Sequence, residues 1–347
     1  MEKQIDFISI CKGIGIILVV LGHLNIGEYW HQVIYSFHMP LFFFISGYLF
    51  KNIYLEIPKD FLLKKAKTLY IPFVKWALIF LLLHNVFVYF HIEKGMYDIK
   101  DYLIGGANIL LFCNYDPILG PTWFLRSLFV SFLIFYSVLF FTRGKKGYRV
   151  PVFILLFLIG ITCSINDISV PYKIERDCVI ASILMAGFTF RNTPPPRLSQ
   201  YYSQNKRVMG VCITVVSLVI LLCINIQANK VDISNSRFGN PLMLVSTSFM
   251  GITLVWSFSK LITNYQGMIT KTLHIIGDNS MAIFMFHVFW FRLGNLIMIL
   301  FYGMEIDHLS DLMTISTASS YWIIVYSIIG VFVPLFINRI YNKLRND

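Results

Sequence analysis

Residues 12–23 read KGIGIILVVLGH, and residues 37–50 read FHMPLFFFISGYLF. Both stretches are almost wholly apolar, yet each contains a histidine, and the first begins with a lysine. A membrane-spanning helix needs about 20 consecutive, mostly apolar residues. With their neighbours, the two stretches are long enough to predict spans at 7–26 and 33–50. They indicate a protein that lies in a bilayer and holds ionisable groups inside it.

The composition of the whole chain supports this prediction. Of the 347 residues 57% are hydrophobic and only 14% are charged, which is too few charges to cover a soluble globule of this size. A soluble enzyme, a nucleic-acid-binding protein and a disordered chain are therefore excluded. We predict one all-α domain over residues 1–347, a polytopic transmembrane helical bundle of about ten spans: 7–26, 33–50, 73–90, 120–141, 150–166, 178–191, 208–227, 241–262, 280–301 and 321–340.

The basic residues predict the orientation. If the N-terminus is cytoplasmic, twenty Lys and Arg residues fall in cytoplasmic segments and six fall in the outer loops. This asymmetry is the positive-inside signal of proteins of the cell membrane, and it accounts for the net charge of +11 without nucleic acid. Both termini are then cytoplasmic. The longer outer loops, near 91–119, 228–240 and 302–320, either hold a polar substrate or are simple solvated connections.

The sequence predicts no metal site. The six cysteines contain no CxxC pair and no zinc-like spacing. No HxxxH or HExxH pattern occurs within the predicted spans, and no carboxylate stands there to support one.

Polar residues inside the spans are the candidates for function, because burying them in a membrane is costly. Lys12 and His23 are eleven residues apart, which places them on one face of a helix with a rise of about 16 Å between them. His38 opens the second span from the same outer side as His23, so the two can form an acid–base or proton-sharing pair. The alternative is that each histidine only satisfies a backbone carbonyl.

Two later spans carry similar features. Trp123 and Arg126 lie three residues apart at the start of the fourth span, either as an aromatic-belt Trp with a snorkelling Arg or as functional groups. The ninth span opens with Gly277-Asp278-Asn279-Ser280, which resembles a helix N-cap. His287 follows Ser280 by seven residues and lies on the same face.

The segment 58–72 is a basic amphipathic stretch on the cytoplasmic side. One interpretation is a helix that lies on anionic lipid. The other is that Lys64, Lys65 and Lys67 attract the phosphates of a cytosolic donor molecule.

Taken together, these motifs resemble those of the acyltransferase-3 family of membrane O-acyltransferases. The resemblance rests on the two opening stretches, the basic run, Thr122-Trp123-Phe124-Leu125, and Asn279-Ser280 followed by His287. In the family's first motif a basic residue precedes a His as Lys12 precedes His23, and Ser9 stands where many members carry Asp. The resemblance implies an acyl-CoA donor, usually acetyl-CoA, and a hydroxyl of a cell-surface or lipid-linked carbohydrate as acceptor, with no permanently bound cofactor.

On this interpretation His23 is the general base for the sugar hydroxyl or, alternatively, an acyl carrier. His38 or Arg126 stabilises the oxyanion, His287 orients the acyl chain or moves protons, and Lys12 lines the donor path. Four further residues are predicted to contact substrate: Trp123, Ser46, Asn279 and Ser280. A transporter or flippase of a lipid-linked sugar is the alternative function, although the inverted repeat that marks many transporters is not visible.

Overall fold

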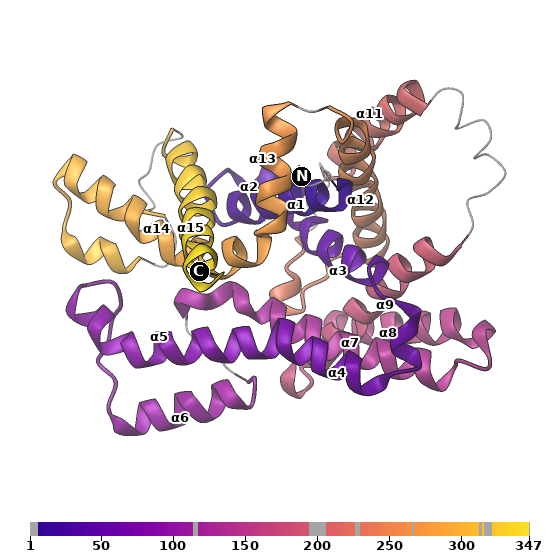
Figure 1. The fold of residues 1–347 in the computed structure, drawn as a ribbon, viewed down its shortest axis with the longest axis horizontal. Helices are drawn as coiled ribbons and strands as arrows, with labels where there is room; N and C mark the ends of the chain where they lie inside the picture. Colours follow the sequence, from indigo (N-terminus) through magenta and orange to yellow (C-terminus); the bar gives the residue numbers. More distant parts are fainter. Residues whose placement is uncertain are drawn as a thin grey trace. The chain divides into compact units, whose positions relative to one another are not determined.

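The computed structural model describes residues 6–113, 117–193, 206–225, 230–265, 267–311, 314–315 and 321–346 (Figure 1). Within these ranges all regular structure is helical, apart from an isolated antiparallel bridge between Asp232 and Arg237. The α-helices are α1 (Phe7–Gly22), α2 (Glu28–Tyr35), α3 (His38–Tyr48), α4 (Pro58–Lys65), α5 (Ile71–Tyr89), α6 (Ile99–Leu110), α7 (Trp123–Phe141), α8 (Arg149–Ile165), α9 (Ile174–Asn192), α11 (Lys206–Asn225), α12 (Pro241–Ile262), α13 (Met268–Asp278), α14 (Ser280–Tyr302) and α15 (Trp322–Asn346).

The connections that the structure describes contain short helical turns: η1 (Asn52–Leu55), η2 (Ala66–Tyr70), η3 (Pro117–Thr122), η4 (Lys146–Tyr148), η5 (Pro171–Lys173), η6 (Ile233–Asn235) and η7 (Ile306–Ser310). The chain forms two compact units. The first comprises Met1–Leu18, Gly27–Leu63 and Ser127–Asp278, and the second comprises Val19–Ile26, Lys64–Arg126 and Asn279–Asp347.

Glycines let helices of the first unit approach closely. A Cβ on Gly47 of α3 would collide with the backbone of Leu184 in α9, and one on Gly13 of α1 would collide with the carbonyl of Leu273 in α13. Small residues at such contacts are typical of membrane helices, which gain packing rather than hydrophobic burial from each other. Helix α13 therefore approaches α1 closely at Gly13.

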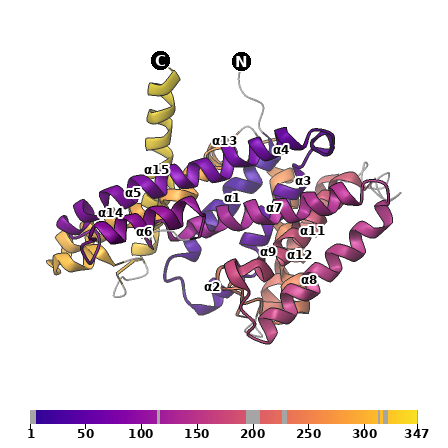
Figure 2. The ribbon, with the colours of Figure 1, turned by 90° about the horizontal axis from the view of Figure 1, so that it is seen from below.

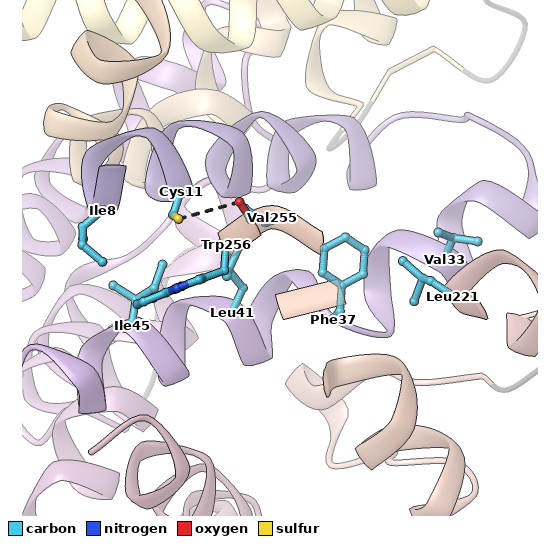
Figure 3. Packing of buried hydrophobic residues seen from close by; sticks show 9 residues of the cluster. All are labelled: Ile8, Cys11, Val33, Phe37, Leu41, Ile45, Leu221, Val255 and Trp256. Atoms are coloured by element: carbon cyan, nitrogen blue, oxygen red, sulfur yellow. Dashed lines mark hydrogen bonds between the residues drawn. The ribbon is translucent and has the colours of Figure 1, made fainter. Parts of the chain in front are cut away.

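An apolar cluster fills the space between α1, α3 and α12 in the first unit (Figure 3). Trp256 of α12 packs edge-on against Phe7 of α1, with 5.0 Å between the ring centroids, and against Tyr48 of α3, with 4.8 Å. Cys11 of α1 approaches the carbonyl of Val255 at 3.9 Å. These contacts hold the first half of α1 against α12.

The second unit is organised around the helical hairpin of α14 and α15. Tyr326 donates to Asn295 Oδ1 at 2.6 Å near one end, and Asn338 donates to Asn279 Oδ1 at 2.8 Å near the other. The two helices are therefore antiparallel. On another face of α14, Phe286 packs against Trp76 and Phe80 of α5.

Among the described residues, seven helices are long and apolar enough to cross a membrane: Pro58–Tyr89, Ile118–Phe141, Lys146–Ile165, Arg207–Asn225, Pro241–Ile262, Ser280–Tyr302 and Trp322–Leu344. Helix α1 is apolar but shorter. An all-helical membrane protein is the fold class that these helices support. The count of ten spans and the cytoplasmic placement of both termini stay predictions.

The prediction of one continuous helix over 33–50 is wrong. The chain is helical as α2 and again as α3, and Phe37 between them leaves the helical conformation with φ −144°. Ser36 stabilises the break, because its hydroxyl donates to Val33 O at 2.8 Å while Ser248 donates to its carbonyl at 3.2 Å. Helices α2 and α3, with 8 and 11 residues, are each shorter than the roughly 20 residues that a membrane-spanning helix needs.

Three further segments differ from the prediction. The basic segment is not a separate interfacial helix, since α4, the π-helical turn η2 and α5 form one helix over Pro58–Tyr89. The long connection at 91–119 contains α6 and the first residues of η3. In addition, the sixth predicted span begins earlier, at Ile174, so the first turn of α9 buries Glu175, Arg176 and Asp177.

Candidate active site

His23 lies directly after the last residue of α1. Its backbone N–H bonds Val20 O at 3.2 Å, which tightens the final turn, and its ring Nδ1 lies 2.8 Å from Val19 O. A carbonyl oxygen can only accept a hydrogen bond, so Nδ1 carries the proton in the neutral ring. The nitrogen of His23 that can accept a proton is therefore Nε2.

His287 is the eighth of the 23 residues of α14, and its side chain is completely buried. Its Nδ1 lies 3.0 Å from both Ile283 O and Phe284 O, so this nitrogen also carries the proton. Its Nε2 is then an acceptor, and it lies 3.5 Å from Nδ1 of His23. The two rings meet edge to face, with 4.9 Å between their centroids.

This arrangement suits His23 to general-base chemistry. When Nε2 takes a proton, the ring becomes a cation whose Nδ1–H points toward two acceptors, Val19 O and Nε2 of His287. Such partners fix the tautomer and the orientation of an imidazole. His287 is thus placed to position His23, rather than to act as a second base.

Comparison with known proteins identifies the family. Residues 5–339 match the acyltransferase domain, which is nearly the whole chain. The chain belongs to the acyltransferase-3 family. A membrane acyltransferase is therefore the function class that the sequence and the helices support.

Two relatives are nodulation proteins. The Nodulation protein NolL of Sinorhizobium fredii (strain NBRC 101917 / NGR234) is 30% identical over 230 residues, which cover 62% of this chain and 56% of the relative. The Nodulation protein NolL of Mesorhizobium japonicum (strain LMG 29417 / CECT 9101 / MAFF 303099) is 29% identical over 156 residues, 41% of this chain and 37% of the relative. The chain thus spans about half or less of the length of the relatives it matches. No solved structure matches it.

The first acyltransferase-3 motif departs from its usual form at Ser9, and the structure shows what faces this residue. The Ser9 hydroxyl donates to Asp278 Oδ1 at 2.6 Å, within the first unit. The end of α13 therefore supplies a carboxylate that contacts α1 at this position. Lys12 lies one turn further along α1, and it also belongs to the first unit.

The second motif lies entirely in the first unit. His38 opens α3 and is buried, with Nδ1 2.7 Å from Ile34 O and its ring 5.0 Å from that of Tyr35. Nδ1 of His38 thus bonds a backbone carbonyl, and the role of His38 in oxyanion stabilisation stays a prediction. Ser46 lies two turns further along α3 and is half-buried.

The end of the motif around α14 corrects one expectation. Asn279 occupies the N-cap position, but its side chain makes no capping hydrogen bond. Its Oδ1 instead accepts from Asn338 Nδ2, which fixes the start of α14 to α15. Ser280 is the first residue of α14. Nothing in the local sequence around Asn338 signals this partnership.

Trp123 and Arg126 lie in the first turn of α7. Phe124 between them packs on Phe284 of α14, with 5.1 Å between the rings, and Phe284 is three residues before His287. Arg126 is only 9% exposed, which is not the placement of a snorkelling side chain. The structure therefore brings the start of α7 to the helix that carries His287.

Three of the lysines of the basic segment, Lys64, Lys65 and Lys67, lie where α4 passes into η2. Lys64 and Lys67 are exposed and Lys65 is half-buried. The hydroxyl of Thr68 donates back to Lys64 O at 2.8 Å inside the helix. A π-helical turn inside a longer helix is often found at functional sites.

Proposed function

We propose that this acyltransferase moves an acyl group, with acetyl as the simplest case, from acyl-CoA to a hydroxyl of a cell-surface or lipid-linked carbohydrate. The observation that carries the proposal is the His23–His287 pair, in which tautomers fixed by carbonyl partners assign Nε2 of His23 as the proton acceptor. Family membership supports acyl transfer over the transporter alternative.

The reaction would run through direct transfer. Nε2 of His23 takes the proton of the sugar hydroxyl as its oxygen attacks the thioester carbon, and a tetrahedral oxyanion forms. Arg126 is the candidate to stabilise that charge. When the carbon–sulfur bond breaks, the leaving thiolate takes the proton from His23, and CoA and the O-acyl sugar are released.

The donor would approach from the cytoplasmic side. Lys64, Lys65 and Lys67 supply positive charge for the phosphates of CoA, and Lys12 lines the route on α1. Trp123, Ser46, Asn279 and Ser280 are the proposed substrate contacts. The setting is the cell membrane, where a cytosolic donor can meet an acceptor at the outer face.

The test is transfer by the purified full chain in lipid vesicles. Radiolabelled acetyl-CoA is supplied with a cell-surface glycan fraction, and label that becomes releasable from the glycan by mild base marks an O-acetyl ester. Wild-type protein is expected to transfer label, and His23→Ala protein is not. Movement of glycan across the vesicle membrane without acetylation would instead support the transporter.

A further inference from the structure

Helix α6 lies antiparallel along α5 in the second unit (Figures 1 and 2). At the end of α5, Asn85 makes two hydrogen bonds with the backbone of Tyr97 just before α6, at 2.8 and 2.9 Å. Where α5 begins, the hydroxyl of Tyr70 donates to Leu110 O at 2.7 Å. Helix α6 therefore runs back along most of the length of α5.

The face of α6 that points away from α5 is apolar throughout. Its exposed residues recur at helical spacing and form one stripe, which we name the α6 stripe: Leu103, Ile104, Ala107, Leu110 and Leu111. Leu103 is 69% exposed and Leu111 is 70% exposed. Residues 102–113 include no charged side chain. In water this would be an uncovered apolar patch, which soluble proteins avoid.

The charged residues of α6 are confined to its first turn. Asp98 and Asp101 form a reciprocal capping box there, with hydrogen bonds of 2.8 and 3.0 Å. At the other end, the backbone N–H groups of Phe112 and Cys113 bond the carbonyls of Ile109 and Asn108. Backbone groups at both ends of α6 thus make their hydrogen bonds within the protein, as the backbone of a segment in hydrocarbon must.

We infer that α6 is embedded in the bilayer and that lipid acyl chains cover the α6 stripe. Its partner α5 belongs to one of the seven helices fit to span a membrane. Leu82 and Val86 of α5 are likewise apolar and exposed. Because α6 runs along most of α5, it lies at the same depth as this spanning helix and therefore in the same bilayer.

One consequence concerns the side of the membrane that each end of α6 reaches. Lys94, in the loop before α6, lies at the end of α5, whereas Cys113 lies near its start, because the ring of the adjacent Phe112 packs on Phe73 at 4.5 Å. The two residues belong to opposite membrane faces. Cys113 shares the face of the basic segment, so the predicted outer loop at 91–119 is largely a membrane-inserted segment.

The inference can be tested by fluorescence quenching of the full chain in phosphatidylcholine vesicles. Cys113, Cys163, Cys212 and Cys223 are replaced by Ala, which leaves the buried Cys11 and Cys178. Single cysteines are then introduced and labelled with bimane as L103C on the stripe, L82C on α5 as the lipid-facing control and K94C in the loop as the aqueous control. Nitroxide-labelled lipid and aqueous iodide are the two quenchers.

The label on L103C is expected to match that on L82C, with quenching by the lipid nitroxide at least several-fold stronger than by iodide. The label on K94C should show the reverse order. Iodide quenching of L103C equal to that of K94C would overturn the inference. If the label on L103C were protected from both quenchers and oxidation gave a disulfide-linked dimer, a second copy of the chain would cover the α6 stripe. That result would also overturn the inference.

Sidedness is tested separately with a membrane-impermeant maleimide on intact cells. Protein that retains only Cys113 among the accessible cysteines should react after permeabilisation, whereas K94C in the background lacking Cys113 should react without it. Labelling of both positions on the same side would show that the chain does not return along α5 within the membrane. Neither experiment depends on acyl transfer, so the inference stands or falls independently of the proposed function.

Discussion

Nε2 of His287 lies 3.5 Å from Nδ1 of His23, although 264 residues separate the two in the chain. In both residues Nδ1 faces a backbone carbonyl of the same helix and carries the proton. His287 therefore accepts a hydrogen bond through Nε2, and His23 keeps its own Nε2 for a proton from another group. His23 is thus the base of the pair, and His287 is the residue that positions it. The predictions for the two residues differ accordingly.

Replacing His23 with Ala removes the proposed base. We expect the transfer rate to fall by about 10²- to 10⁴-fold, the usual contribution of a general base, while the protein still inserts and purifies as a single species. The matched control is His91→Ala, since the side chain of His91 is 53% exposed and pairs with Asp307 in the predicted outer loops. Near-normal transfer by well-folded His23→Ala protein would contradict the assignment.

Replacing His287 with Ala should lower the rate less. It removes an acceptor for the cationic form of His23, and a hydrogen bond to a charged group contributes about 1.5–3 kcal/mol, equivalent to about 10- to 100-fold in rate. His287→Gln, which can keep an acceptor, should recover part of the loss. The Michaelis constant for acyl-CoA should not change. If both variants lose yield but keep full turnover per folded molecule, His287 has only a packing role.

The donor site is tested by replacing Lys64, Lys65 and Lys67 together with Gln. The Michaelis constant for acyl-CoA should rise and its salt dependence should flatten, because salt screens attraction between exposed charges. The maximal rate should change little. The control removes the same charge from another basic loop, as Arg143→Gln, Lys145→Gln and Lys146→Gln. Equal effects of the two triple variants would mean that the lysines serve topology alone.

Gly13 provides a test of packing. A methyl group on Gly13 would collide with the carbonyl of Leu273, whereas nothing lies within 4 Å of the position of a Cβ on Gly106. Both substitutions to Ala gain the same helix propensity. We therefore expect Gly13→Ala to destabilise the protein by about 1–3 kcal/mol and Gly106→Ala to be neutral or stabilising. Thermal unfolding in detergent measures the difference, and equal melting temperatures would contradict the close contact.

Orientation is tested with reporters. A fluorescent protein fused after Asp347 should fluoresce, and alkaline phosphatase at the same position should be inactive, because the distribution of Lys and Arg predicts a cytoplasmic location for this end. Phosphatase fused after Lys94 should be active. Phosphatase activity at Asp347 would refute the predicted orientation.

Local sequence decided the class of this protein. A segment in hydrocarbon must be apolar along its length and must satisfy its own backbone, so long uncharged runs predict membrane helices without any knowledge of their neighbours. The acyltransferase-3 family could be identified for a similar reason, since its motifs are short runs such as the one from Lys12 to His23. The candidate histidines were found because an ionisable group within an apolar run stands out in the sequence alone.

Only the tertiary structure decided how those residues are used. The partner of His23 is on α14, and no periodicity in the sequence connects positions so far apart. The break at Ser36 depends on a hydrogen bond from Ser248 of α12. The return of α6 along α5 depends on contacts made by Asn85 and Tyr70. Each of these features rests on a few directional contacts between distant segments, whereas the apolar character of a helix is a property of the segment itself.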